Sequence, residues 1–575
     1  MAISLFNDKS PTTFDAIVVG SGISGGWAAK ELCEAGLKTL VLERGRHIEH
    51  GDYPTANTDP WDYENEGQGQ SAIREKLSVE EEKDYEKQKR TGYVTNRAHR
   101  HHFVKDSEHP YQEEPGTRFD WIRGYHTGGR SIVWGRQSYR WSDIDFGANA
   151  KDGIAIDWPI RYKDLKPYYD KVERYIGVSG MKEGWAALPD GDFEPPMDFT
   201  APEAYLRASM KENFDDRILT IGRTAHLTGQ EGRPEQNRQS CKFRNRCMRG
   251  CPYGAYFSSN SSTLPAAERT SNLTLRPFSI VAEVIRDEKT GLATGVRVID
   301  QETKESYVFN AKVIFLNASA IASTSILMQS GDWANESGQL GNNLMDHHFQ
   351  VGASASVEGF EDLFYKGRRA NGFYIPRFRN LGGKTNKNYL RGYGYQGGAN
   401  RENWMRGVKE LSYGATFKDQ LFKPGSWRIG MNGFGEMLPY EENTMRLDNS
   451  MLDAWGLPQV RFNTSIKENE LKMREDMANS AAEIFESAGF KSVTTYDGNY
   501  GVGLGIHEMG TARMGHDPKT SVLDKHNRVH ACKNVYVTDG AAMTSSACVN
   551  PSLTYMALTV RAAEHAVGEL KKMNL

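Results

Sequence analysis

The hydrophobic and polar positions near the N-terminus follow first a strand pattern and then a helix pattern. Residues 15–19 form a short run rich in β-branched side chains, and residues 38–42 form a second strand-like run. Between them, Ala28, Ala29 and Leu32 recur at the spacing of one helical face. The order strand, helix, strand predicts a parallel βαβ unit at the start of an α/β fold.

The strand and helix patterns recur in separate later segments of the chain. Residues 273–316 alternate as sheet strands do, and residues 534–538 predict a last strand before a helix over 553–566. Residues 349–499 differ, because they are rich in aromatic, glycine and polar positions and predict one helix over 466–488. The sequence therefore predicts two kinds of region that alternate along the chain.

The length of the chain fits that division. At 575 residues it is too long for one ordinary core, so we expect two domains or one elaborated domain. We expect a discontinuous dinucleotide-binding domain from residues 1–160, 240–348 and 500–575, and substrate-binding and cap regions from residues 161–239 and 349–499.

The first predicted helix follows a glycine-rich turn. Gly20, Gly22 and Gly25 have the spacing Gly-x-Gly-x-x-Gly, and Glu43 follows the second strand. In such a unit the first glycine makes a tight turn, the second admits a pyrophosphate and the third allows close helix–strand packing. Glu43 is placed to accept hydrogen bonds from ribose hydroxyls. The unit favours dinucleotide binding over a structural turn, but it does not separate FAD from NAD.

A second glycine-rich stretch covers residues 123–135. It includes Gly128, Gly129 and Ser131. A backbone that carries no bulky side chains can lie against a planar ligand. The alternative is a glycine-rich turn between core strands.

Charge and hydropathy narrow the range of partners. The 71 basic and 74 acidic residues give a net charge of −3, which gives no support to nucleic acid as a partner. No apolar run approaches the roughly 20 residues that span a bilayer. Residues 1–8 lack the basic and apolar regions of a signal peptide and contain no twin arginine, so we expect no export address in the chain itself.

Three of the six cysteines lie close together. Cys241, Cys247 and Cys251 could converge on one metal centre, and Cys251 is followed by proline. A structural zinc site normally takes four protein ligands, whereas thiolates alone hold iron–sulfur clusters. Three ligands suit a three-iron cluster or a four-iron cluster with an open corner. Reduced structural cysteines are an equally good interpretation from the spacing alone.

Candidate catalytic residues gather near the C-terminus. His507 follows the cap region, Asp539 and Gly540 end the last predicted strand, and Asn550 precedes the last predicted helix. A histidine and an asparagine beside a flavin could oxidise an alcohol. The alternatives are a core histidine with satisfied hydrogen bonds and a helix-capping asparagine.

Two further patterns have both a functional and a structural interpretation. Asp346, His347 and His348 could bind a metal ion, but neighbouring strand residues point to opposite faces, which favours a structural role. Aromatic side chains in the cap region could line a pocket for a carbohydrate ring or fill a sheet core. They are Trp404, Tyr413, Phe417, Trp427, Phe434 and Tyr440.

Taken in this order along essentially the whole chain, the motifs resemble the glucose–methanol–choline (GMC) oxidoreductase family. The resemblance implies FAD rather than NAD, a three-layer Rossmann-like domain, and an α+β substrate domain whose antiparallel sheet lies over the flavin. It also implies a set of FAD-binding residues. They are Gly20, Gly22, Gly25, Glu43, Gly128, Gly129, Ser131, Val281, Asp539, Gly540 and Asn550.

Within the family the chain is similar to the large subunits of bacterial sugar dehydrogenases. In one branch, three cysteines at this spacing hold a 3Fe-4S cluster, which favours a cluster at Cys241, Cys247 and Cys251. Such subunits are exported to the periplasm by a small partner with a twin-arginine signal and pass electrons to a cytochrome c; a cytoplasmic location is the alternative. Some relatives bind FAD covalently through a histidine where this chain has Val133, so non-covalent FAD is expected.

These features predict a sugar dehydrogenase. His507 is expected to take the hydroxyl proton, because imidazole titrates near working pH, and Asn550 to orient the same oxygen for hydride transfer to flavin. Oxidation at C3 of a glucoside is favoured over glucose C1 or gluconate. The alternatives are a flavin oxidase, a non-catalytic electron-transfer subunit and an NAD-linked dehydrogenase.

Overall fold

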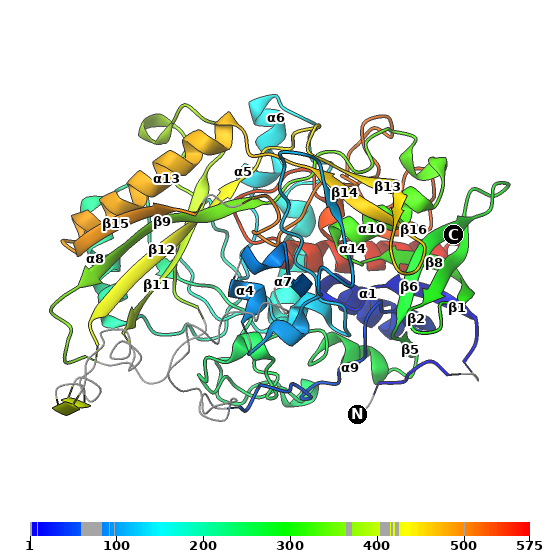
Figure 1. Ribbon diagram of the computed structural model, residues 1–575, viewed down its shortest axis with the longest axis horizontal. Coiled ribbons are helices and arrows are strands. Elements are labelled where there is room, and N and C mark those ends of the chain that lie inside the picture. Colours follow the sequence, from blue (N-terminus) through cyan, green and yellow to red (C-terminus); the bar gives the residue numbers. More distant parts are fainter. Residues whose placement is uncertain are drawn as a thin grey trace.

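The computed structural model describes residues 3–7, 10–58, 83–90, 92–96, 98–363, 371–402, 414–415, 418–419, 425–498 and 501–575. Two large sheets lie on opposite sides of the molecule (Figure 1). Each sheet draws its strands from separate parts of the chain.

The seven-stranded sheet contains the βαβ unit predicted from the glycine-rich turn. Its order is β5-β2-β1-β8-β7-β6, and β16 also pairs with β8. Strand β1 is parallel to β2 and to β8, whereas β6, β7 and β8 form an antiparallel meander. The strands are β1 (Thr13–Val19), β2 (Thr39–Leu42), β5 (Leu273–Arg276), β6 (Ser279–Arg286), β7 (Ala293–Asp300), β8 (Ser306–Leu316) and β16 (Val535–Val537).

Two long helices cover one face of this sheet. They are α1 (Ile23–Glu34) and α14 (Ser552–Lys571), which contact each other. Alternate residues of β1 point to opposite faces, so Ala16 and Val18 pack with these helices while Ile17 joins the core on the other side. Helices α7 (Tyr162–Ile176) and α9 (Thr263–Glu268) extend the layer, packing on α14 and α1 respectively.

The six-stranded sheet is antiparallel, as expected for the substrate region. Its order is β15-β9-β12-β11-β10-β4. The strands are β4 (Thr220–Ile221), β9 (His347–Val357), β10 (Phe373–Ile375), β11 (Tyr393–Arg401), β12 (Trp427–Glu436) and β15 (Lys491–Asp497). Strands β13 (Thr444–Leu452), β14 (Pro458–Asn463) and β3 (Gln112–Glu113) form a smaller, separate sheet.

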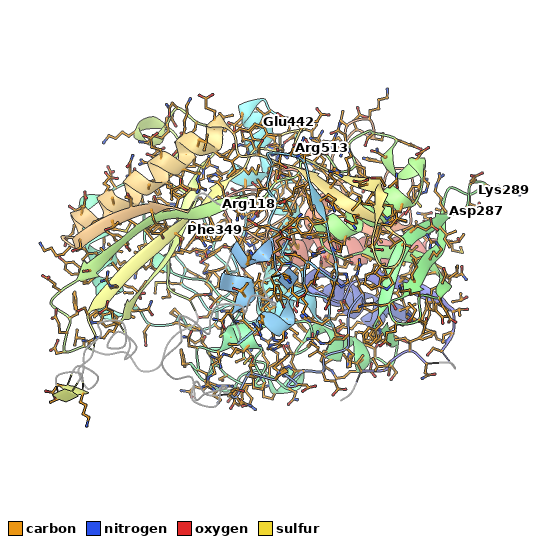
Figure 2. All side chains as sticks on the ribbon, in the orientation of Figure 1. Arg118, Asp287, Lys289, Phe349, Glu442 and Arg513 are labelled. Carbon is orange, nitrogen blue, oxygen red and sulfur yellow. The ribbon has the colours of Figure 1, made fainter. Side chains whose placement is uncertain are left out.

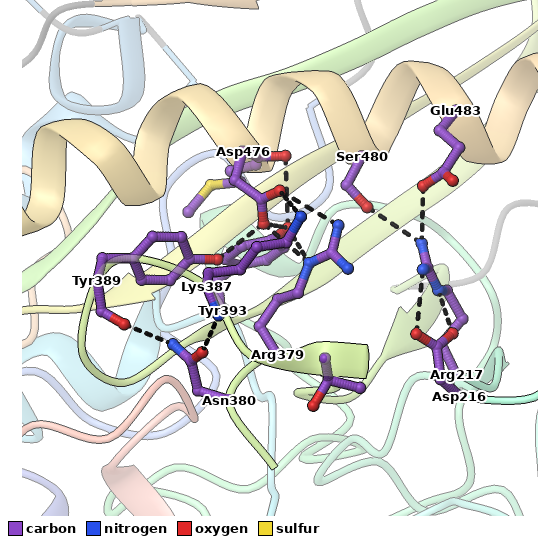
Figure 3. Close-up of polar contacts among 12 residues, drawn as sticks. Asp216, Arg217, Arg379, Asn380, Lys387, Tyr389, Tyr393, Asp476, Ser480 and Glu483 are labelled. Carbon is purple, nitrogen blue, oxygen red and sulfur yellow. Dashed lines mark hydrogen bonds and ion pairs between the residues drawn. The ribbon is translucent and has the colours of Figure 1, made fainter. Parts of the chain in front are cut away.

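Helix α13 (Glu468–Ser487) runs across one face of the six-stranded sheet (Figure 1). Its apolar face buries Met473, Met477 and Ile484 against the strands. A polar network adds to this packing (Figure 3): Asp476 accepts hydrogen bonds from Arg379 at 2.8 Å and from the hydroxyls of Tyr389 and Tyr393 at 2.7 and 2.6 Å. The network therefore helps to attach α13 to the sheet.

Candidate functional site

A cavity of about 560 Å³ is lined by residues from both large sheets. Gly20 follows β1, whereas Gln396 lies on β11 and Phe434 on β12. Phe349, another lining residue, lies near the middle of the molecule, while Lys289 lies at its outer edge (Figure 2). The cavity is therefore the place where the dinucleotide turn meets the predicted substrate region.

The three glycines of the turn have different roles. Gly20 has a φ of +93°, and a Cβ there would lie 2.4 Å from the carbonyl oxygen of Asn317. A Cβ at Gly25 would lie 1.9 Å from the carbonyl oxygen of Gly20. These two glycines allow the turn, α1 and β8 to pack closely.

Gly22 faces the cavity instead. It lines the cavity and precedes α1, and among the described residues no atom lies within 4 Å of the position its Cβ would occupy. The N-terminus of α1 presents backbone N–H groups and positive potential at this point. The open space and the helix end together fit a pyrophosphate.

Glu43 lies directly after β2 and is buried at the edge of the cavity. Its Oε2 accepts a hydrogen bond from the hydroxyl of Ser21 at 2.5 Å, and its Oε1 accepts one from the backbone N–H of Gly45 at 3.0 Å. Burial raises the pKa of this carboxyl group. The position suits an acceptor for ribose hydroxyls.

The second glycine-rich stretch lies against the first. Gly128 has a φ of +85°, its N–H donates to the hydroxyl of Ser21 at 2.9 Å, and a Cβ there would collide with Asn260. Gly128 therefore serves packing, as Gly25 does. The other residues expected at the cofactor line the cavity: Gly20, Gly22, Glu43, Gly129, Ser131, Val281, Asp539, Gly540 and Asn550.

Within the part of the chain that the structure describes, several buried polar atoms around this cavity have no hydrogen-bond partner. They include the hydroxyl of Tyr555, which could donate or accept a hydrogen bond, and Oδ1 of Asn317, which could accept one. Buried polar groups are normally paired, so these atoms fit a polar ligand such as a dinucleotide. Near them, Arg130 forms an ion pair with Glu508 at 2.9 Å.

His507 lines the same cavity. Its Nδ1 lies 2.7 Å from Nδ1 of His347, the first residue of β9. Burial, the neighbouring His347 and the charge of Arg130 lower the pKa of His507 well below its ordinary value. The ring is therefore neutral at pH 7 and keeps a lone pair for a proton. It is a weaker base than the imidazole titrating near working pH that the sequence predicts, because burial and the nearby positive charge disfavour the protonated ring.

Asp346 holds the backbone that carries His507. Its Oδ2 accepts hydrogen bonds from the N–H groups of Gly503 and Gly505, both at 2.8 Å, and its Oδ1 accepts one from the N–H of His507 at 3.0 Å. Burial and the charge of Glu508 raise the pKa of Asp346 to about 7. The sequence indicated a metal-binding or a structural role for Asp346 and His347 and did not predict these contacts with His507.

The adjacent histidines His347 and His348 do not form a metal site. His347 points toward His507, whereas His348 packs against Gly435 on the other side of the strand. Opposite orientation follows from the strand geometry that the sequence predicted.

Asn550 is held by a residue that sequence reasoning missed. Nε2 of Gln396 on β11 donates to Oδ1 of Asn550 at 2.5 Å. Asn550 does not cap the last helix, because Pro551 occupies the N-cap and α14 begins at Ser552. A lone glutamine within a strand carries no signal of this contact.

The aromatic side chains predicted to line one pocket lie in different parts of the structure. Phe434 lines the main cavity, Trp427 is buried in the core of the six-stranded sheet, and the Tyr440 hydroxyl donates to Glu470. Trp404, Tyr413 and Phe417 lie outside the described residues.

The three clustered cysteines line a second, smaller cavity of about 30 Å³. His226 and Tyr256 also line it, and all six cysteines of the chain are free thiols. Burial raises the pKa of the Cys241 thiol to about 11. Within the described part of the chain, no group of three His, Cys, Asp or Glu side chains is arranged to hold a metal ion.

Comparison with known proteins assigns the family. Two models described as GMC oxidoreductase match residues 14–349 and 439–559. The chain belongs to the GMC oxidoreductase family. It is therefore an FAD-dependent oxidoreductase that acts on CH–OH groups, with the mixed α/β architecture of that family. Within the described residues, no helix is long and apolar enough to cross a membrane.

Relatives of known activity match over nearly their full length. The chain is 28% identical to a 2-methyl-1,2-propanediol dehydrogenase of Mycolicibacterium austroafricanum, covering 96% of this chain and 94% of the relative. It is 25% identical to a fructose dehydrogenase large subunit of Gluconobacter japonicus, covering 97% and 98%. A pyridoxine 4-oxidase from Mesorbium loti has the same fold, with a TM-score of 0.60 and 16% identity over 96% of this chain and 98% of that one.

Proposed function

We propose that this GMC oxidoreductase is a sugar dehydrogenase that oxidises a secondary alcohol of a sugar or glucoside, with C3 favoured. One observation carries the proposal: His507 and Asn550 line the same cavity as the dinucleotide turn. A neutral imidazole accepts a proton, and an amide whose oxygen is already bound offers its NH₂ group as a donor. The pair therefore suits a hydroxyl group that must lose its proton.

The residues divide the reaction between them. Bound FAD would take the hydride from the carbinol carbon. His507 takes the hydroxyl proton, and Asn550 donates to the same oxygen and so orients the carbon that bears it. Gly22, the N-terminus of α1 and Glu43 would hold the ADP part of FAD. Val133 offers no atom for a covalent link where some relatives have a histidine, so FAD would be bound non-covalently.

The wall formed by the six-stranded sheet favours a sugar as substrate. Phe349 and Phe434 stack with their ring centroids 5.1 Å apart, and both line the cavity with Gln137, Asn371 and Gln396. Aromatic faces with amide groups beside them match the apolar faces and hydroxyl groups of a carbohydrate ring. A small vicinal diol is the second candidate, supported by the diol dehydrogenase among the relatives.

The electrons would leave through a 3Fe-4S cluster at Cys241, Cys247 and Cys251. The three free thiols line one cavity, and thiolates are the ligands such clusters use. Their sulfur atoms would have to move together to bind the cluster, because the described residues contain no preformed group of three metal ligands. Residues 241–251 contain four basic residues and no acidic one, and a fifth basic residue, Arg238, lies just before them. The four are Lys242, Arg244, Arg246 and Arg249. This charge would offset the thiolates and attract an acidic face of a cytochrome c. Export to the periplasm with a small twin-arginine-signal subunit completes the proposal.

A spectrum, an iron and sulfide assay and a substrate panel test the proposal on the purified protein. We expect a flavin spectrum and anaerobic bleaching of the flavin by sugars or glucosides. We also expect about three iron atoms per chain, the content of one 3Fe-4S cluster. FAD should be released by denaturation. Flavin without iron removes the cluster, bleaching by small diols alone favours the second candidate, and the absence of flavin from freshly purified protein refutes the assignment as a whole.

Two further measurements address the site and the carbon. His507→Ala should retain FAD but lose flavin reduction by about 100-fold or more, the usual contribution of a general base. Full activity in this variant would remove His507 as the base. Mapping the oxidised carbon in the product by NMR distinguishes C3 from C1 oxidation.

A further inference from the structure

The contact between His347 and His507 has a direction that the neighbouring groups determine. Two imidazole Nδ1 atoms 2.7 Å apart form a hydrogen bond only if one carries a proton and the other does not. The partners of the remaining ring nitrogens decide which one is the donor.

The Nε2 atom of His347 must carry a hydrogen. It lies 3.1 Å from the carbonyl oxygen of Ser546 and 3.0 Å from that of Ala547, and carbonyl oxygens only accept hydrogen bonds. Burial lowers the pKa of His347 to about 4, so the ring is neutral and carries a single proton. The Nδ1 atom of His347 is therefore left with a lone pair.

It follows that His507 donates from Nδ1. Its own single proton is then used in the bond to His347, and its Nε2 is left with a lone pair. We infer that His347 is a positioning residue that holds His507 in the tautomer whose Nε2 accepts the substrate proton. This inference rests on the proposed role of His507 as the base.

The surroundings also fix the orientation of both rings. The ring of His347 stands edge-on to His507 and to Phe434, with interplanar angles of 84° and 82°. The preceding residue, Asp346, binds the backbone N–H of His507. Adjacent residues at the start of β9 thus hold the backbone and the ring of His507. The other charged groups near this ring are Arg130 and Glu508, which pair with each other.

A pair of variants separates tautomer control from packing. His347→Asp keeps an acceptor for the Nδ1–H of His507 but buries a charge, whereas His347→Leu keeps an apolar side chain and removes the acceptor. A purely structural role predicts that leucine is tolerated better. Tautomer control predicts the reverse order: in stopped-flow flavin reduction, His347→Leu should be slower by about 100-fold, and His347→Asp by no more than about 10-fold at high pH.

The pH profile gives a second readout in the same experiment. The new carboxylate of His347→Asp raises the pKa of His507, so its rate should fall at a higher pH than the wild-type rate when pH is lowered. His347→Leu should be slow at every pH. Flavin content and substrate Kd, measured on each variant, should stay near the wild-type values. Equal or faster flavin reduction by the leucine variant would overturn the inference.

Neutron diffraction of the wild-type holoenzyme tests the tautomer without any substrate. We expect hydrogen at Nε2 of His347 and at Nδ1 of His507, and none at Nε2 of His507. Hydrogen at Nε2 of His507 would refute the inference even if the enzyme oxidises sugars. If the expected hydrogens are present but no sugar reduces the flavin, the tautomer assignment stands and the proposed substrate class fails.

Discussion

The two glycines Gly22 and Gly25 provide a matched test of what each position of the turn does. A methyl group at Gly25 would meet the carbonyl oxygen of Gly20 at 1.9 Å, so the turn and α1 would have to separate by about 1 Å or more. Forced overpacking costs about 1–3 kcal/mol, and we expect the upper end because the obstacle is backbone. A methyl group at Gly22 meets no described atom within 4 Å.

The expected outcomes of Gly25→Ala and Gly22→Ala therefore differ. Gly25→Ala should lower the free energy of unfolding of the apoprotein by about 3 kcal/mol. Gly22→Ala should change it by less than about 1 kcal/mol, because the loss of a favourable N-cap residue and the reduced entropy of the unfolded chain nearly cancel. Its Cβ would instead enter the space assigned to the pyrophosphate and weaken FAD binding at least tenfold, about 1.4 kcal/mol.

Chemical denaturation of the apoprotein and a fluorescence titration with FAD measure the two effects separately. The added stability of the holoprotein should fall in parallel with affinity in Gly22→Ala, because a ligand stabilises the folded state according to its Kd. If Gly22→Ala binds FAD as tightly as the wild type, the pyrophosphate does not lie at this residue. If apo Gly25→Ala is as stable as the wild type, the close contact with Gly20 does not constrain the turn.

Three other changes test the supporting residues. Asp346→Asn should keep FAD but slow flavin reduction by about 10- to 100-fold, because the charged acceptor for the His507 N–H contributes about 1.5–3 kcal/mol. Since the pKa of Asp346 is raised to about 7, the wild-type rate should fall as the pH drops below about 7. If Asp346→Asn shows the same dependence of rate on pH, protonation of Asp346 is not its cause. Gln396→Leu should slow flavin reduction by about 10-fold, and a double-mutant cycle with Asn550→Ala should show coupling; additive effects would mean that the 2.5 Å contact is not used. Asp476→Ala should lower stability by about 3 kcal/mol in denaturant titrations while flavin reduction stays at the wild-type rate, and a kinetic defect would show that the wall of the cavity moves with α13.

Local patterns in the sequence determined much of the first sheet. The βαβ unit follows from the apolar runs around α1, and the Gly-x-Gly-x-x-Gly turn follows from backbone sterics over a few residues. These features depend on neighbours in the chain, so they can be predicted from period and residue type. The ends of elements were less certain: α14 begins at Ser552 and continues to Lys571, beyond the predicted 553–566.

The tertiary structure decided how the catalytic groups are supported. His347 and His507 are separated by 160 residues in sequence, and Gln396 and Asn550 by 154. Their contacts depend on how the six-stranded sheet sits against the dinucleotide turn, which no local pattern encodes. The sequence by itself supplied a histidine and an asparagine beside a nucleotide-binding unit. Only the packing of the two sheets determines which atoms of this histidine and this asparagine donate hydrogen bonds and which accept them, because their partners are distant in the chain.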